Sequence, residues 1–157
     1  MDKRKNFAIV SCQDSFNTNT VYNLYYAKSS EFKEDEDIKY IGLYKHGVVR
    51  AIGEVSKIAE GIFSEKNLNV IVGNHLTDSE EKRIWDAIRV GDIIFNCAIE
   101  KESHKFFLVK SYVPTYYKKV SNGPLRQLEY KDICEVLNTS NLGSIVDIAE
   151  KLKTEIW

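Results

Sequence analysis

The sequence predicts an α+β fold in which a small barrel-like or mixed β-sheet is flanked by helices. Short strand-like segments are spread over residues 7–110, and two of them form an obvious hairpin. Helical spacing is confined to residues 77–89 and to the C-terminal part of the sequence. The length of 157 residues fits one domain, so we expect a single unit over residues 1–157 that includes the C-terminal helices.

The bulk composition indicates a folded globular protein. Hydrophobic residues make up 43% of the chain and charged residues 29%, and the net charge is −1. A nucleic-acid-binding role would therefore need a local basic patch. The apolar run near the N-terminus is too short for a signal peptide or a membrane span, so we expect a cytoplasmic protein without membrane contact. Cys12, Cys97 and Cys134 are widely spaced, which favours free thiols over a disulfide or a zinc site.

The first forty residues alternate between apolar and polar stretches. Phe7–Cys12 is a short apolar run typical of a buried strand. The polar residues 13–20 predict a loop, and residues 21–30 fit either a strand or a short helix. The acidic residues 31–39 predict a solvated connection.

The segment Tyr40–Ile58 predicts a β-hairpin around the two-residue turn His46-Gly47, because glycine adopts positive φ freely. Counting away from the turn places Gly42, Ala51 and Gly53 on the same face as two tyrosines, Tyr40 and Tyr44. Small residues beside large rings leave room that a helix of the same chain, or a flat ring from outside, could fill. The predicted pairs are Lys45–Val48, Tyr44–Val49, Leu43–Arg50, Gly42–Ala51, Ile41–Ile52, Tyr40–Gly53 and Lys39–Glu54.

The second half of the chain adds strands and helices. Thr77 and Glu80 have the spacing of a capping box, which predicts a helix from there to about Arg89, ended by Gly91. The remaining expected elements are a strand at Leu68–Val72, a hairpin of Asp92–Ile99 with Lys105–Lys110, and helices at Tyr130–Leu137 and Ser144–Ile156, the last with Ser144 as N-cap.

Three short motifs resemble the PUA-like superfamily, which includes EVE, ASCH and YTH domains. They are the hairpin strand VVRAIGEV, the step IRVGDIIF at residues 88–95, and the opening IVSCQDS. The resemblance covers about two thirds of the chain and implies a PUA-like fold that binds DNA or RNA. In some members of the superfamily this means recognition of a modified or flipped base, in RNA-modification or bacterial restriction and defence systems. The tryptophans expected near the first strand are absent here, so tyrosines would have to form the pocket.

The residues supply candidates for such a site. Aromatic rings can stack on bases, short polar side chains can bind base edges, and lysine or arginine can contact phosphates. For each candidate a purely structural role remains open; Trp85, for instance, could pack in the core beside Ile84 and Ile88. The predicted base-binding pocket contains Ser11, Gln13, Asn17, Asn19, Tyr22, Tyr44, Trp85 and Tyr116, and the predicted phosphate-binding residues are Lys110, Lys118, Lys119 and Arg126.

Catalytic and metal motifs do not stand out. His46, His75 and His104 share no metal-ligand spacing, and the sequence contains neither a GxGxxG nor a GxxxxGK loop. We therefore predict no metal, no cofactor and no catalytic residues. Two alternatives to a nucleic-acid-binding module stay open: a small nuclease or hydrolase on the same scaffold, and a nucleotide-sensing or protein-interaction domain.

Overall fold

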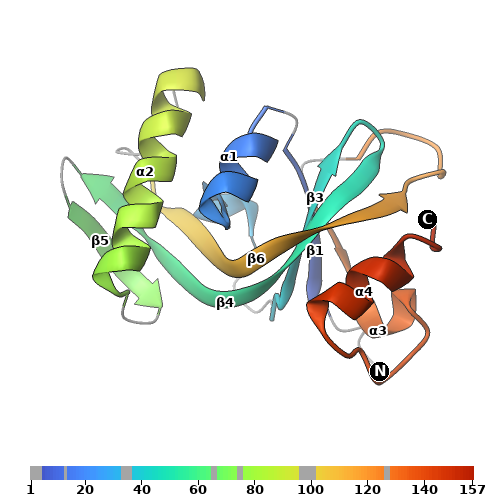
Figure 1. Cartoon of the computed structure of the whole chain (residues 1–157). Coiled ribbons are helices and arrows are strands. Elements are labelled where there is room, and N and C mark those ends of the chain that lie inside the picture. Colours follow the sequence, from blue (N-terminus) through green and yellow to red (C-terminus); the bar gives the residue numbers. More distant parts are fainter. Residues whose placement is uncertain are drawn as a thin grey trace.

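Two long, curved strands organise the fold. In the computed structural model, which describes residues 5–12, 14–32, 37–64, 67–73, 76–95, 102–125 and 128–157, β4 (Val48–Ser64) pairs antiparallel with β6 (His104–Lys118). Their register shifts at several points between Val49 and Lys57, and both strands bend into a trough (Figure 1). The long pair thus connects β2 and β5, which flank one end of it, with β3, which flanks the other end.

The sheet is mixed, as expected for an α+β fold. Its strand order is β2-β6-β4-β3-β1-β7, and β5 pairs with the far end of β4. Strands β1 and β3 are parallel, whereas the other pairs are antiparallel. Within the described residues, β2 and β7 end the path without pairing with each other, so the sheet is an open curl. The shorter strands are β1 (Phe7–Ser11), β2 (Leu24–Lys28), β3 (Tyr40–Lys45), β5 (Asn67–Gly73) and β7 (Leu128–Lys131).

The helices cover the sheet in three hydrophobic clusters. Helix α2 (Asp78–Phe95) packs on the ends of β2 and β6, and α3 (Ile133–Val136) with α4 (Ile145–Leu152) covers the opposite end (Figure 1). Between them, α1 (Phe16–Tyr22) lies over the trough, and the short 3-10 helix η1 (Ser29–Glu31) follows β2. In the described part of the chain, no helix has both the length and the apolar character needed to cross a membrane.

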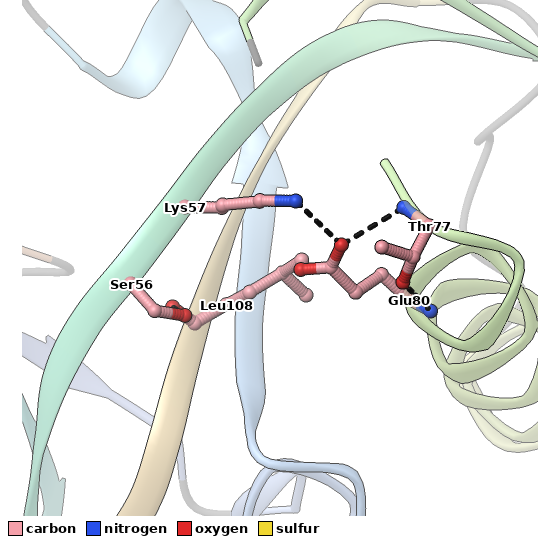
Figure 2. A network of polar contacts seen from close by, with 5 residues as sticks. All are labelled: Ser56, Lys57, Thr77, Glu80 and Leu108. Carbon is pink, nitrogen blue, oxygen red and sulfur yellow. Dashed lines mark hydrogen bonds and ion pairs between the residues drawn. The ribbon is translucent and has the colours of Figure 1, made fainter. Parts of the chain in front are cut away.

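A capping box and an ion pair connect the start of α2 to the sheet (Figure 2). The predicted capping box is confirmed: Glu80 N donates to Thr77 Oγ1 at 3.2 Å, and Thr77 N donates to Glu80 Oε1 at 2.9 Å. Lys57 Nζ, from β4, donates to the same carboxylate oxygen at 2.6 Å. These donors lower the pKa of Glu80 to about 2, with the Lys57 hydrogen bond as the largest cause. The neighbouring Ser56 Oγ donates to Leu108 O at 3.1 Å, where the two long strands bend.

The hairpin is confirmed, but its register differs from the prediction beyond the first two pairs. Lys45–Val48 and Tyr44–Val49 are paired as expected, and then a bulge leaves Arg50 without an opposite residue. The count moves by one as a result, so that Leu43 pairs with Ala51. The other corrected pairs are Gly42–Ile52, Ile41–Gly53 and Tyr40–Glu54.

The space beside the two hairpin tyrosines is filled by the protein itself. A Cβ on Gly42 would lie 2.8 Å from Cε1 of Phe7 and 3.0 Å from Cγ1 of Val49. The corrected register moves Ala51 and Gly53 to the opposite face, where a Cβ on Gly53 would lie 2.9 Å from Val109. Tyr40 and Tyr44 pack against the cluster that contains Phe7 of β1 together with residues of α3 and α4, so strand and helix side chains of the same chain fill this room.

Four secondary-structure expectations were wrong. Residues 13–20 contain the start of α1, whose polar residues are stabilised by packing: Thr18 and Asn19 are buried. Helix α2 continues through Gly91, because one glycine costs a helix only about 1 kcal/mol. The hairpin expected from residues 92–99 and 105–110 is therefore not formed as predicted, because residues 92–95 are helical and residues 96–99 lie outside the described residues. The strand Lys105–Lys110 is part of β6, which pairs with β2 and β4. The C-terminal helices are shorter than predicted; β7 precedes α3, while Ser144 is confirmed as the N-cap of α4.

Candidate nucleic-acid interface

The β3–β4 turn brings cationic groups together at one end of the sheet. His46 and Gly47 have φ of 52° and 82°, which is the conformation of a tight two-residue turn. The bulge at Arg50 turns its side chain back over this turn: Arg50 Nε donates to Lys45 O at 2.7 Å. Lys45 Nζ lies 5.6 Å from the centroid of the Phe16 ring at the start of α1.

The end of β6 extends this cationic group across the sheet. Val48 pairs with both Lys45 and Lys118, so these two lysines lie in one cross-strand row on the same face, with Cα atoms about 10 Å apart. Lys118 also forms a parallel bridge with Ile156. Tyr116 lies two residues before Lys118 and is 48% exposed. We call Lys45, Arg50, Tyr116 and Lys118 the basic tip.

The cations of the basic tip have no acidic partners among the described residues. None of the ion pairs between described residues involves Lys45, Arg50 or Lys118. Many other cations are paired: examples are Lys28–Glu102, Lys57–Glu80, Lys82–Asp86, Lys105–Glu60, Lys131–Glu129 and Lys153–Glu150. The basic tip is thus a local excess of positive charge on a chain whose net charge is −1.

An aromatic cluster, made of Tyr44, Tyr117 and Trp157, lies on the opposite face of the same strands. Tyr44 pairs with Ser11 on one side and with Val49 on the other, and Val49 pairs with Tyr117. The Trp157 ring lies against both tyrosines, with centroid distances of 4.3 Å to Tyr117 and 6.2 Å to Tyr44. Burial, with the nearby carboxylates of Glu129 and Glu155, raises the pKa of Tyr117 to about 12, so its hydroxyl stays protonated at neutral pH.

The residues of the predicted base pocket lie in several separate places. Tyr44 lies in the aromatic cluster and pairs with Ser11 of β1, whereas Tyr116 belongs to the basic tip. Tyr22 and Trp85 pack against the cluster under α2, together with Leu24, Ile84 and Phe106. Asn17 is exposed on α1, whereas Asn19 is buried and Gln13 lies outside the described residues. The structure therefore does not bring the eight residues together in one pocket.

The buried Asn19 stabilises the junction between β1 and α1. Asn19 Nδ2 donates to Ser15 Oγ at 3.1 Å, and its backbone N–H donates to Ser15 O at 2.9 Å. The adjacent Cys12 thiol is also buried, which raises its pKa to about 12 despite the opposing effect of Lys45. At neutral pH this thiol is protonated and unreactive. Cys12 and Cys134 are free, and Cys97 lies outside the described residues.

The predicted phosphate-binding residues have different surroundings. Lys118 is exposed and part of the basic tip. Lys110 Nζ lies 3.6 Å from Glu54 Oε2, so a carboxylate already compensates its charge. Lys119 Nζ donates to Ser121 O, Ser121 Oγ and Gly123 O at 2.8–2.9 Å, which uses its three hydrogens to hold the following loop. Arg126 lies outside the described residues.

A second surface with an aromatic ring and cations lies on α2. Its shallow groove is lined by Asp78, Glu81, Lys82, Trp85, Asp86 and Arg89. Asp86 binds both cations of the groove, with its carboxylate oxygens 3.0 Å from Lys82 Nζ and 3.7 Å from Arg89 Nη1. Three carboxylates around the groove disfavour the approach of a phosphate. Among the described residues, no three His, Cys, Asp or Glu side chains are grouped as metal ligands would be.

Sequence reasoning missed four residues of these two faces: Lys45, Arg50, Tyr117 and Trp157. Lys45 and Tyr117 could have been found, since Lys45 flanks the predicted turn and Tyr117 is adjacent to Tyr116. Arg50 joins the tip through a bulge, which alternation of apolar and polar residues does not reveal. Trp157 contacts Tyr44, which is more than a hundred positions away in the sequence, and nothing local indicates this contact.

Comparisons with known proteins provide little information about function. No protein-family model matches the sequence, and no curated protein is significantly similar to it. A crystal structure of an ASCH protein mutant from Zymomonas mobilis resembles the chain with a TM-score of 0.48 and 12% identity, over 82% of this chain and 90% of that one. A resemblance this weak does not establish a shared fold, so the function has to be argued from the residues themselves.

Proposed function

We propose that this protein is a nucleic-acid-binding module of the PUA-like type that holds a strand at the basic tip and takes a base into an aromatic pocket. The observation that carries the proposal is the group of Lys45, Arg50 and Lys118, which lack acidic partners in the described part of the chain and share this end of the sheet with the exposed Tyr116. Uncompensated cations beside an exposed ring are the surface that a phosphate backbone with accessible bases requires.

The geometry supports a division of roles within the tip. The two lysines are spaced by about 10 Å, which lets them contact different phosphates of one strand. Arg50 is held at the turn by its hydrogen bond to Lys45 O and keeps further N–H groups for a phosphate oxygen. Tyr116 provides a ring on which a base can stack, which favours a single strand or an unpaired base over an intact duplex. The side chains of the aromatic pocket would then recognise which base it is and whether it is modified.

Binding of fluorescent single-stranded RNA and DNA, measured by anisotropy over a series of salt concentrations, tests the phosphate contacts. We expect the double variant Lys45→Ala, Lys118→Ala to bind more weakly and to reduce the slope of log K against log salt by about 1.4, since each lost phosphate contact accounts for about 0.7 on a single strand. DNA and RNA of equal sequence, in parallel, would establish which of them is preferred.

The matched control removes two cations that the structure shows to be compensated. Lys82→Ala with Arg89→Ala changes the net charge by the same amount, but both side chains contact Asp86. Its salt slope should equal that of the unmodified protein. Equal slopes for the two double variants would contradict the role of the basic tip, because the loss would then reflect net charge alone.

A further inference from the structure

The Trp157 ring has contacts that a bound nucleic-acid base would need. Its centroid lies 4.3 Å from that of Tyr117 with an interplanar angle of 30°, and Tyr44 meets it nearly edge-on at 66°. Trp157 Nε1 donates to Glu129 Oε2 at 3.2 Å. Lys131 Nζ lies 5.2 Å from the ring centroid. An indole, which is flat, bicyclic and has an N–H on its edge, is close in shape to a purine.

The hydrogen bonds and ring contacts of Trp157 connect it to β3, β6, β7 and the loop after β6. Helix α4 ends at Leu152, and the segment that follows contacts β6 through one isolated bridge between Lys118 and Ile156. Trp157 N donates to Lys118 O at 3.1 Å, and Trp157 O accepts from Val120 N and Ser121 N. Ile156, next to it, is 62% exposed. Helix α4 has an attachment of its own to β6, because Thr115 Oγ1 donates to Ala149 O at 2.6 Å.

We propose that the position of the Trp157 ring between Tyr44 and Tyr117 is a guanine-binding site that Trp157 occupies until a nucleic acid displaces it. The inference rests on the proposed function, since phosphates at the basic tip would place a base here: Lys118 and Tyr117 are adjacent on β6 and project from opposite faces of the same edge. Guanine is favoured because its edge carries two neighbouring N–H donor groups, N1–H and N2–H2, and Glu129 has two acceptor oxygens: Oε2 accepts from Trp157 Nε1, and Oε1 lies 3.6 Å from Lys131 Nζ.

The protein contains two tryptophans, so one substitution makes Trp157 a reporter of its own displacement. In a Trp85→Phe background, we expect the Trp157 emission to move to longer wavelength when a single-stranded oligonucleotide with one guanine binds. An oligonucleotide of the same length without guanine should bind more weakly and leave the emission unchanged. Trp157→Ala should strengthen binding of the guanine oligonucleotide several-fold, because the competing ring is gone.

Two further variants make the result decisive. Glu129→Gln keeps Trp157 and loses one acceptor, so it should abolish the preference for guanine even if Trp157→Ala folds poorly. Trp85→Ala removes the other tryptophan as a matched control and should leave the preference intact. Binding that depends on Lys45 and Lys118 but shows neither a guanine preference nor a change in Trp157 emission would overturn this inference alone. Absence of any oligonucleotide binding would overturn the proposed function and this inference with it.

Discussion

The basic tip and the α2 groove contain similar residues in different electrostatic settings. Each has one large aromatic ring and at least two cations: Tyr116 with Lys45 and Lys118 at the tip, and Trp85 with Lys82 and Arg89 on α2. On α2 the cations contact Asp86, and Arg89 lies 5.6 Å from the Trp85 ring. At the tip no described carboxylate contacts them. Aromatic and basic residues alone therefore do not distinguish the proposed nucleic-acid site from the α2 groove; the absence of compensating acid does.

The difference follows from the secondary structure of each region. On a helix, residues three and four apart are neighbours, so Lys82, Asp86 and Arg89 contact one another as soon as α2 forms. Such exposed pairs contribute little stability but neutralise local charge. At the tip, a turn, a bulge and the end of a distant strand bring the cations together. Like charges converge there only because the sheet holds them in place.

The largest expected effect concerns the ring at the tip. Tyr116→Ala should weaken single-strand binding about tenfold, within the range of 1–3 kcal/mol for loss of one stacked base, and leave the salt slope unchanged. Anisotropy titrations at two salt concentrations measure both quantities. Tyr116→Phe should retain most of the affinity. Val146→Ala, which shortens a similarly exposed apolar residue on α4, is the control and should bind normally. A changed slope with Tyr116→Ala would show that the variant disturbs the cations rather than the stacking.

The next effect is on stability and tests whether the charges at the start of α2 are structural. Lys57→Met removes the main donor to Glu80 and should lower the free energy of unfolding by about 1 kcal/mol near neutral pH, while binding stays normal. The pKa of Glu80 is lowered from 4.5 to about 2 in the folded protein. Its contribution to stability is therefore complete above pH 4.5 and lost as the pH falls toward about 2.

Urea unfolding at several pH values measures this contribution. The difference between Lys57→Met and the unmodified protein should be largest near neutral pH and shrink between about pH 4.5 and pH 2, because a protonated Glu80 no longer attracts Lys57. Lys153→Met, which breaks the more exposed pair with Glu150 on α4, is the matched control and should cost less. A difference independent of pH would indicate lost packing of the lysine stem instead of the ion pair.

These regions also show how far the sequence could be interpreted. Local signals predicted the turn at His46-Gly47, the capping box at Thr77 and the N-cap at Ser144, because each depends on residues a few positions apart. The bulge at Arg50 changed the hairpin register beyond Tyr44, since a bulge is chosen by the curvature of the whole sheet. Residues 13–20 were expected to be a loop because Asn and Thr are weak helix formers, yet burial of Thr18 and Asn19 overrides that preference.

The candidate site was harder to predict than the fold for the same reason. Lys118 and Tyr116 stand out because aromatic and basic residues alternate locally in residues 110–119. Whether a lysine is compensated depends on contacts between elements: Lys110 contacts Glu54 across two strands, and Lys118 contacts no carboxylate of the described chain. Sequence pattern thus identifies cations, and only the tertiary structure separates those that are free to bind phosphate.

The smallest expected effect comes from removing compensating acid from the α2 groove, so that its charges resemble those of the basic tip. Asp86→Asn removes the carboxylate that contacts Lys82 and Arg89 without changing the side-chain size much. Two cations beside Trp85 would then lack their nearest acid, and we expect non-specific binding of single strands to increase about twofold at low salt, with a slightly steeper salt slope.

Asp78→Asn, in the same groove but outside these ion pairs, is the matched control and should change affinity less, since it alters net charge alone. If both variants gain equally, overall charge rather than local compensation distinguishes the two regions. If Asp86→Asn alone gains, the groove differs from the tip chiefly by that one carboxylate.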